Sequence, residues 1–139
     1  CDGVNYLDSL KAAEEFFEAA NAALKMGGLL LFDISSQYKL ENILGCNTFA
    51  EDEQGGAYIW KNNYDPKSRL IEMNLTFFER QGELYRRFTE RHIQRAHSVD
   101  ELLSALNRAG FDAEAYDFET MDPVKPDSER VQFSGRKRR

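Results

Sequence analysis

A short apolar run, Leu29 to Ile34, constrains the fold most, because it follows directly on an amphipathic segment. Apolar or small residues recur in that segment at spacings of three and four, which predicts a helix over 8–26: Leu10, Ala13, Phe17, Ala20 and Leu24. Asp8 is the expected N-cap, and Gly27-Gly28 the expected stop. The run itself is interrupted only by Asp33 and is typical of a strand covered on both faces, as in a parallel sheet. A helix that leads into such a strand is half of a βαβ unit and indicates the α/β class.

The middle of the chain has the pattern of an antiparallel sheet. Residues 35–54 show no clean period, and we expect a long connection there with one helical turn near Tyr38 to Ile43. An extended segment begins at Tyr58, and 70–78 alternates apolar and polar residues, as a strand with one dry face does. A turn at 81–83 leads into a further extended run over 84–94. Together these segments predict a meander of about three strands.

The C-terminal part returns to helix and strand. Ser98 and Glu101 have the spacing of a capping box, so we expect a helix that begins there and ends at Gly110. Residues 111–118 and 130–135 are the last two expected strands, and the loop between them contains Pro123 and Pro126.

Length and charge exclude several classes of protein. A chain of 139 residues is one ordinary domain. Its net charge is −6, and without the basic C-terminal run Arg136 to Arg139 only 14 basic residues stand against 24 acidic ones. So acidic a body argues against nucleic-acid binding, which needs many phosphate contacts, and we expect the basic run to be a solvated end. No segment has the length of a transmembrane helix, so we expect no membrane partner.

The two cysteines, Cys1 and Cys46, lack the spacing of a disulfide scaffold or a metal site. We therefore expect no metal and a reducing, cytoplasmic location. The chain begins with Cys1 and not with Met, which is expected of a processed product or of a piece of a longer protein. A lipidated Cys1 at the start of a bacterial lipoprotein is a more remote alternative.

Several literal strings occur in an order that resembles the C-terminal half of class I S-adenosylmethionine-dependent methyltransferases, in a bacterial subgroup with an antiparallel insert. They are Asp2-Gly3-Val4-Asn5-Tyr6-Leu7, Leu24-Lys25-Met26-Gly27-Gly28-Leu29-Leu30-Leu31-Phe32-Asp33, Tyr38-Lys39-Leu40, Ala109-Gly110-Phe111 and Ser128-Glu129-Arg130. The resemblance implies strands five to seven of a Rossmann-like sheet with two flanking helices. It places this partial core in residues 1–35 and 96–139, and an inserted substrate or lid subdomain in residues 36–95.

The family's glycine-rich cofactor loop and the acid that binds the ribose do not occur in this sequence. The resemblance therefore implies a C-terminal fragment or truncated product of a longer enzyme. Its cofactor would be S-adenosylmethionine, which this chain alone would bind weakly or not at all.

The resemblance places Asp2, Asn5 and Tyr6 at the carboxyl end of a strand, facing the methionine end of the cofactor. The alternative is that Asn5 organises the turn into the helix. Asp33, at the end of the apolar run, either orients a substrate amine or hydroxyl, or binds backbone amides of the next loop. Tyr38 and Lys39 follow in a loop that should cover the substrate pocket, although a lysine there is often simply solvated.

The expected insert is rich in aromatic residues, which either form its own core or line the acceptor pocket, where we expect Trp60 and Tyr58. Glu90 and His92 share one face of an extended segment. They are candidates for a general base and its partner, with a cross-strand ion pair as the alternative.

Two functions remain open on the sequence. The first is methyl transfer to a small-molecule acceptor, with this chain as the substrate-side half of the enzyme. The second is an inactive module that binds a protein partner or forms a homodimer, through an exposed sheet edge or through the surface that the missing half would cover.

Overall fold

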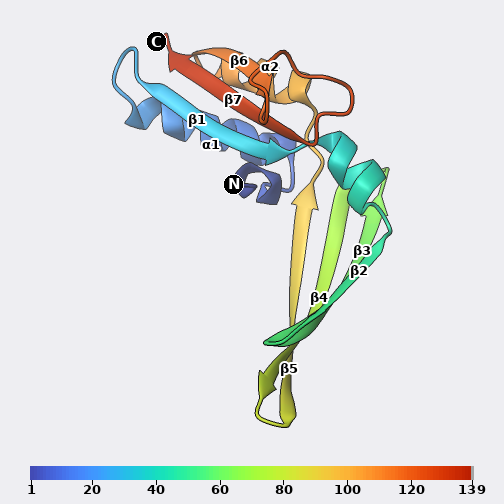
Figure 1. The fold of residues 1–139 in the computed structure, drawn as a ribbon. Helices are drawn as coiled ribbons and strands as arrows, with labels where there is room; N and C mark the ends of the chain where they lie inside the picture. The colour runs from blue at the N-terminus through green and yellow to red at the C-terminus, as the bar shows by residue number, and fades with distance from the viewer. Residues whose placement is uncertain (139) are drawn as a thin grey trace.

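The computed structural model describes residues 1–138. The chain folds into two antiparallel sheets with helices packed against them (Figure 1). The first sheet has the order β1-β7-β6, with β1 over Leu29–Ser35, β6 over Phe111–Asp117 and β7 over Arg130–Lys137. The second has the order β2-β3-β4-β5 and projects from the first as an arm (Figure 1). We call the first sheet with its helices the body and the second sheet the arm. The chain is thus α/β, as predicted, with both sheets antiparallel in the described residues.

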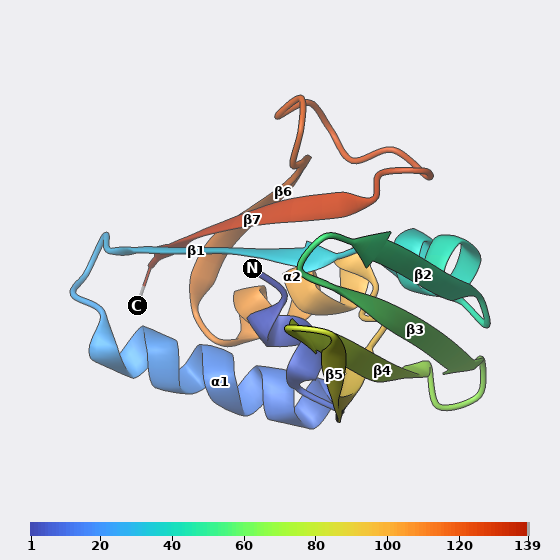
Figure 2. The same cartoon turned by 60° about the horizontal axis from the view of Figure 1, so that its bottom comes forward.

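The main core lies in the body, between the three-stranded sheet and two helices, α1 (Leu10–Ala23) and α2 (Val99–Arg108). Both helices lie on the same side of that sheet (Figure 2). The ring of Phe32 stacks on that of Phe133 at 4.9 Å, and both strands present alternate residues to the helices. The largest fully buried apolar side chains of this core are Phe17, Ile34, Leu102, Leu106, Phe111, Val131 and Phe133. Each stabilises the body by about 1.5–3 kcal/mol relative to exposure.

The prediction that β1 is covered on both faces is wrong for the described chain. Leu29 and Leu31 are 47% and 62% exposed, while Ile34 is fully buried. The helices cover only one face of the sheet, and β1 is an edge strand that pairs with β7 alone among residues 1–138. The apolar run therefore carries one dry face and one open face.

The ends of α1 also differ from the prediction. Ser9, and not Asp8, is the N-cap: Ser9 has an extended backbone, and its Oγ accepts a hydrogen bond from the Ala12 amide at 3.2 Å. The helix ends at Ala23, ahead of the glycine pair. Gly27 has φ +75°, and a Cβ on Gly28 would lie 2.8 Å from the Lys25 carbonyl oxygen. The pair therefore shapes the turn into β1 and does not itself end the helix.

The arm has four strands where about three were predicted. They are β2 (Thr48–Glu53), β3 (Gly56–Asp65), β4 (Leu70–Gln81) and β5 (Leu84–Arg95). β2 escaped prediction because five of its six residues are exposed, so it lacks an apolar alternation. The turn after Gln81 and the dry face of β4 are as predicted, with Ile71 and Met73 buried beneath a π-helix, η2 (Lys39–Leu44).

A 3-10 turn, η1 (Gly3–Tyr6), lies where body and arm meet, against β1 and β5. The predicted capping box at the start of α2 is present: the Ser98 hydroxyl accepts from the Glu101 amide, and the Glu101 carboxylate accepts from the Ser98 amide. β6 and β7 begin at the predicted residues, and β7 extends two residues further than expected. Arg139, the end of the basic run, lies outside the described residues.

Candidate functional site

The candidate site begins on the face of the arm that η1 contacts, where β5 places polar side chains beside the apolar row of β4. His92 lies opposite Met73 and Glu90 opposite Leu75 in the antiparallel register. The turn η1 brings Tyr6 onto this face from the body, so that its hydroxyl lies 2.9 Å from His92 Nδ1. Residues from two distant parts of the sequence therefore meet at one point.

Tyr6, His92 and Glu90 form a hydrogen-bonded chain, which we call the relay. His92 Nε2 lies 3.1 Å from Glu90 Oε2, and the rings of Tyr6 and His92 meet edge to face at 5.9 Å. An ionised carboxylate only accepts hydrogen bonds, so a neutral His92 donates from Nε2 and accepts the Tyr6 hydroxyl proton at Nδ1. Because Tyr6 is 48% exposed, its oxygen is open to an incoming molecule. The relay can thus take a proton from a substrate, with Glu90 stabilising the imidazolium.

The predicted proximity of Glu90 and His92 is confirmed, but not as a cross-strand ion pair, since both lie on β5. Cross-strand ion pairs of β5 involve other residues: Arg91 Nη2 lies 2.7 Å from Glu72 Oε2 on the opposite face, and Arg86 Nη1 lies 3.9 Å from Glu79 on the same face as His92. The hydrogen bond from Arg91, followed by that from Asn74, lowers the pKa of Glu72 to about 2. No local pattern predicts that Tyr6 contacts His92, because 86 residues separate them.

A second cluster surrounds Arg130 at the start of β7. The Arg130 guanidinium contacts the carboxylates of both Asp2, at 2.8 Å, and Asp33. Burial alone would raise the pKa of Asp33, but its hydrogen bonds, among them the one from Arg130, lower it. Asp33 is therefore neutralised by a guanidinium and not by backbone amides of the next loop. In the sequence, Arg130 stands out only as part of the string Ser128-Glu129-Arg130. The burial of Asp33 requires a partner but does not identify Arg130 as that partner.

Asn5 joins η1 to two strands through side-chain hydrogen bonds. Its side chain is 0% exposed, donates from Nδ2 to the carbonyl oxygens of Ser35 (3.0 Å) and Arg95 (3.2 Å), and accepts from the Ser35 amide (3.0 Å). These bonds fix η1 between the ends of β1 and β5. Contact of Asn5 with a cofactor stays a prediction. By holding η1 in place, Asn5 positions the neighbouring residues Asp2 and Tyr6.

Tyr38 and Lys39 have neighbours other than the residues of the relay. Lys39 Nζ is 3.6 Å from the Glu129 carboxylate, and Tyr38 lines a separate cavity of about 140 Å³ with His97. Their role with a substrate stays a prediction.

The aromatic residues of the arm divide into two groups. Trp60 packs near η2 with Phe49, at 5.4 Å between ring centroids, and its buried Nε1 has no hydrogen-bond acceptor within residues 1–138. Tyr58 belongs to the far end of the arm, where it lines a pocket with Phe77 and Phe88. Trp60 therefore packs against the core of the arm, and a role of Trp60 and Tyr58 in an acceptor pocket stays a prediction.

A buried network at the base of the arm was missed on the sequence. The Glu101 carboxylate binds Arg69 at 2.6 Å and Arg95 at 3.3 Å, and His97 lies beside it, 0% exposed. His97 donates from Nε2 to the Leu7 carbonyl oxygen at 2.8 Å and accepts from Arg95 at Nδ1. A lone histidine after a strand has no sequence signal for such a role.

The residues present fit only part of S-adenosylmethionine. The carboxylate of Asp2 and the hydroxyl of Tyr6 are partly exposed and suit the amino-acid end of that molecule. No glycine of the described chain forms a strand-to-helix loop for its nucleoside end, since Gly28 precedes a strand and Gly55 and Gly56 join two strands. Within residues 1–138 no group of three or more acidic, His or Cys side chains is placed to hold a metal. The helices of this part are also too short or too polar to cross a membrane.

No family model matches the chain. A protein of Bacillus subtilis (strain 168) with the name "Putative methyltransferase YqeM" is 33% identical over 99% of this chain and 56% of its own length. A crystal structure of an S-adenosylmethionine-dependent methyltransferase from Clostridium acetobutylicum ATCC 824 is 31% identical, with a TM-score of 0.90 over 98% of this chain and 55% of that one. Over nearly its whole length this chain is thus similar to part of an S-adenosylmethionine-dependent methyltransferase. The CcbJ methyltransferase from Streptomyces caelestis, 14% identical with a TM-score of 0.79, shares the fold.

The relationship confirms the methyltransferase resemblance seen in the sequence. The chain spans about half the length of the curated relatives that it matches, 56% in both the Bacillus protein and a Geobacillus sp. (strain WCH70) protein of the same description. The activity of the whole protein is therefore a matter for proposal.

Proposed function

We propose that this chain is the acceptor-side, C-terminal half of an S-adenosylmethionine-dependent methyltransferase that acts on a small molecule in the cytoplasm. The observation that carries the proposal is the 31% identity and TM-score of 0.90 to one such enzyme over nearly all of this chain. In this proposal residues 1–35 and 96–139 complete a Rossmann-like core, residues 36–95 form the inserted subdomain, and the glycine-rich loop belongs to the other half.

When bound, S-adenosylmethionine supplies an electrophilic methyl group whose leaving group is neutral, so the protein needs mainly to align the acceptor. An acceptor amine or hydroxyl must also lose a proton as its new bond to carbon forms. The relay provides the path: the acceptor gives its proton to the Tyr6 oxygen, the Tyr6 hydroxyl proton moves to His92 Nδ1, and Glu90 stabilises the charge on the ring. Arg130 contacts the carboxylates of both Asp2 and Asp33.

The proposal is tested with the protein extended upstream to include the glycine-rich loop. It is incubated with methyl-tritiated S-adenosylmethionine and an extract of host cells that has been separated into small-molecule, protein and nucleic-acid fractions. We expect label in the small-molecule fraction, and a decrease of about 100-fold or more with His92→Gln. Arg91→Gln, next along β5 but on its other face, is the matched control and should retain activity. Label in none of the fractions, or only in protein or nucleic acid, would contradict the proposal.

A second candidate, a catalytically inactive module that self-associates or binds a protein, is favoured by one observation. The edge strand β1 leaves Leu29 and Leu31 exposed on an open sheet face. Unpaired edges and apolar patches of this kind favour pairing with another chain.

A further inference from the structure

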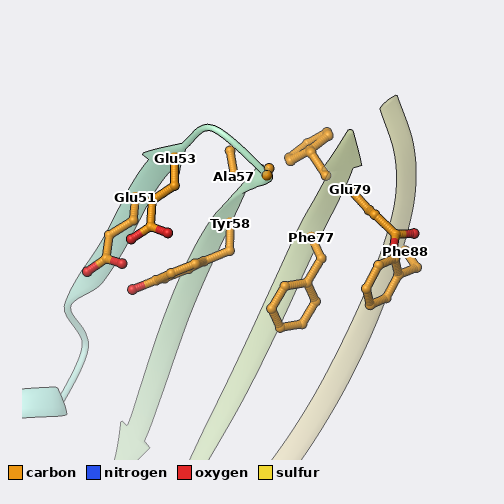
Figure 3. A pocket seen from close by; sticks show the side chains of 10 residues that line it. Glu51, Glu53, Ala57, Tyr58, Phe77, Glu79 and Phe88 are labelled. Carbon is orange, nitrogen blue, oxygen red and sulfur yellow. The ribbon is translucent and has the colours of Figure 1, made fainter. Parts of the chain in front are cut away.

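The far end of the arm holds a pocket that the relay does not use. It has a volume of about 300 Å³ and lies where the hairpin of β2 and β3 meets β4 and β5. Its floor is a row of three aromatic rings, one from each of three neighbouring strands: Tyr58, Phe77 and Phe88 (Figure 3). Phe77 and Phe88 stack at 5.0 Å, and Tyr58 lies 6.4 Å from Phe77. We call this the tip pocket.

Carboxylates stand around the aromatic row. Glu51 and Glu53 project from β2 beside Tyr58. Glu79, on β4, lies near Phe88 of β5 (Figure 3). Burial, then a hydrogen bond with Glu51, and then the charges of Glu51 and Glu53 raise the pKa of Tyr58. The tip pocket thus combines flat apolar walls with negative charge.

The chain itself shows what this surface attracts. The Arg86 guanidinium carbon lies 5.8 Å above the centroid of Phe88, and its Nη1 lies 3.9 Å from the Glu79 carboxylate. A cation is therefore already held by one aromatic face and one carboxylate at the edge of the pocket. At the Tyr58 end of the row, Glu51 and Glu53 form no ion pair with a cation among residues 1–138.

We infer that the tip pocket binds a small organic cation, an alkylammonium or guanidinium group carried on a flat apolar body. The aromatic faces attract the positive charge and cover the apolar body, and the carboxylates give the preference for a cation over a neutral molecule. A volume of about 300 Å³ is in the range of small-molecule sites, which favours a free small molecule as the occupant. No residue of the relay lines the tip pocket, and the nearest relay residue, Glu90, lies two residues from Phe88 along β5.

The inference is tested on the 139-residue chain by titrating benzyltrimethylammonium while recording amide shifts by NMR. Benzyl alcohol and phenylacetate serve as neutral and anionic counterparts of similar size. We expect saturable shifts centred on residues 58, 77 and 88, and about fivefold or greater weakening for both counterparts. Equal binding of benzyl alcohol, no saturable shifts, or shifts centred elsewhere would overturn the inference.

Three substitutions locate the charge effect. Glu51→Gln should weaken benzyltrimethylammonium about threefold, whereas Asp52→Asn, the same loss of charge on the opposite face of β2, should change it little. Arg86→Gln removes the competing cation and should tighten binding. These side chains are exposed, so the variants should fold, which their amide spectra would show. Equal weakening by Asp52→Asn, or weaker binding in Arg86→Gln, would contradict the assignment.

Discussion

His97 is the residue whose chemistry depends most on the fold. It lies between β5 and α2, is fully buried, and uses both ring nitrogens as a neutral imidazole, one toward Leu7 and one toward Arg95. Burial, the largest effect, lowers the pKa of His97 below its usual 6.5, even though Glu101 and the Leu7 carbonyl favour the charged form. Protonation of the ring would also remove its acceptor for Arg95.

This lowered pKa predicts a pH dependence of stability. The unfolded chain takes up a proton near pH 6.5 and the folded chain only at lower pH, so the free energy of unfolding should decrease as pH falls from about 6.5 toward 5. Urea titrations across that range should show the decrease. His97→Gln should remove it, and His92→Gln, at the other histidine of the chain, should retain it. Identical pH profiles for wild type and His97→Gln would contradict this role.

For single residues, the sequence predicts candidate reactive side chains better than it predicts which residues they contact. Glu90 and His92 were predicted as a pair because they are two residues apart on one strand face, and that much is local. Tyr6, Arg130 and His97 gained their roles from segments 86 to 128 residues away, and no local pattern reports such contacts. Asp33 shows the intermediate case, since its burial required a partner but did not identify it.

Among the elements, the hairpin of β2 and β3 determines where the carboxylates of the tip pocket lie. It turns at Gln54 and Gly55, and the first residue of β3, Gly56, has φ +154°, a region that side chains rarely adopt. A Cβ on Gly56 would lie 2.3 Å from the Phe78 carbonyl oxygen of the neighbouring strand, whereas a Cβ on Gly55 meets no atom within 4 Å.

The two glycines should therefore respond differently to substitution. Gly56→Ala should lower the free energy of unfolding by about 1–3 kcal/mol, because it combines backbone strain with a clash against β4. Gly55→Ala is the matched control and should change it by less than about 0.5 kcal/mol. Denaturant unfolding of both variants measures the difference, and equal effects would show that the Gly56 backbone is not the constraint.

Element prediction succeeded where patterns are local. The capping box of α2, the turn after Gln81 and the dry face of β4 follow from spacing alone. β2 was missed because an exposed, acidic strand has no alternation and is defined by its pairing with β3. The sequence predicts burial of both faces of β1 because both carry apolar residues, but burial of the second face depends on what packs there.

At the scale of the whole molecule, the body has one helix-covered face and one open face (Figure 2). The open face carries Leu29 and Leu31 at the edge strand β1. A chain with this surface should associate with itself when no other segment covers the face.

Light scattering of the 139-residue chain over a range of concentrations should show its average mass rising toward that of a dimer. Leu31→Lys should keep the chain monomeric, because a charge on the open face disfavours pairing. Leu84→Lys, at an exposed leucine in the far turn of the arm, is the control and should not change the association. A wild-type chain that stays monomeric at high concentration would contradict the prediction.

The central claim, that this chain is half of a methyltransferase, is tested most directly by calorimetric titration of S-adenosylmethionine. The titration compares the 139-residue chain with the same chain extended upstream to include the glycine-rich loop. We predict saturable heat with one site per molecule for the extended protein, and little or none for the 139-residue chain. No heat from the folded extended protein at millimolar S-adenosylmethionine would contradict the account.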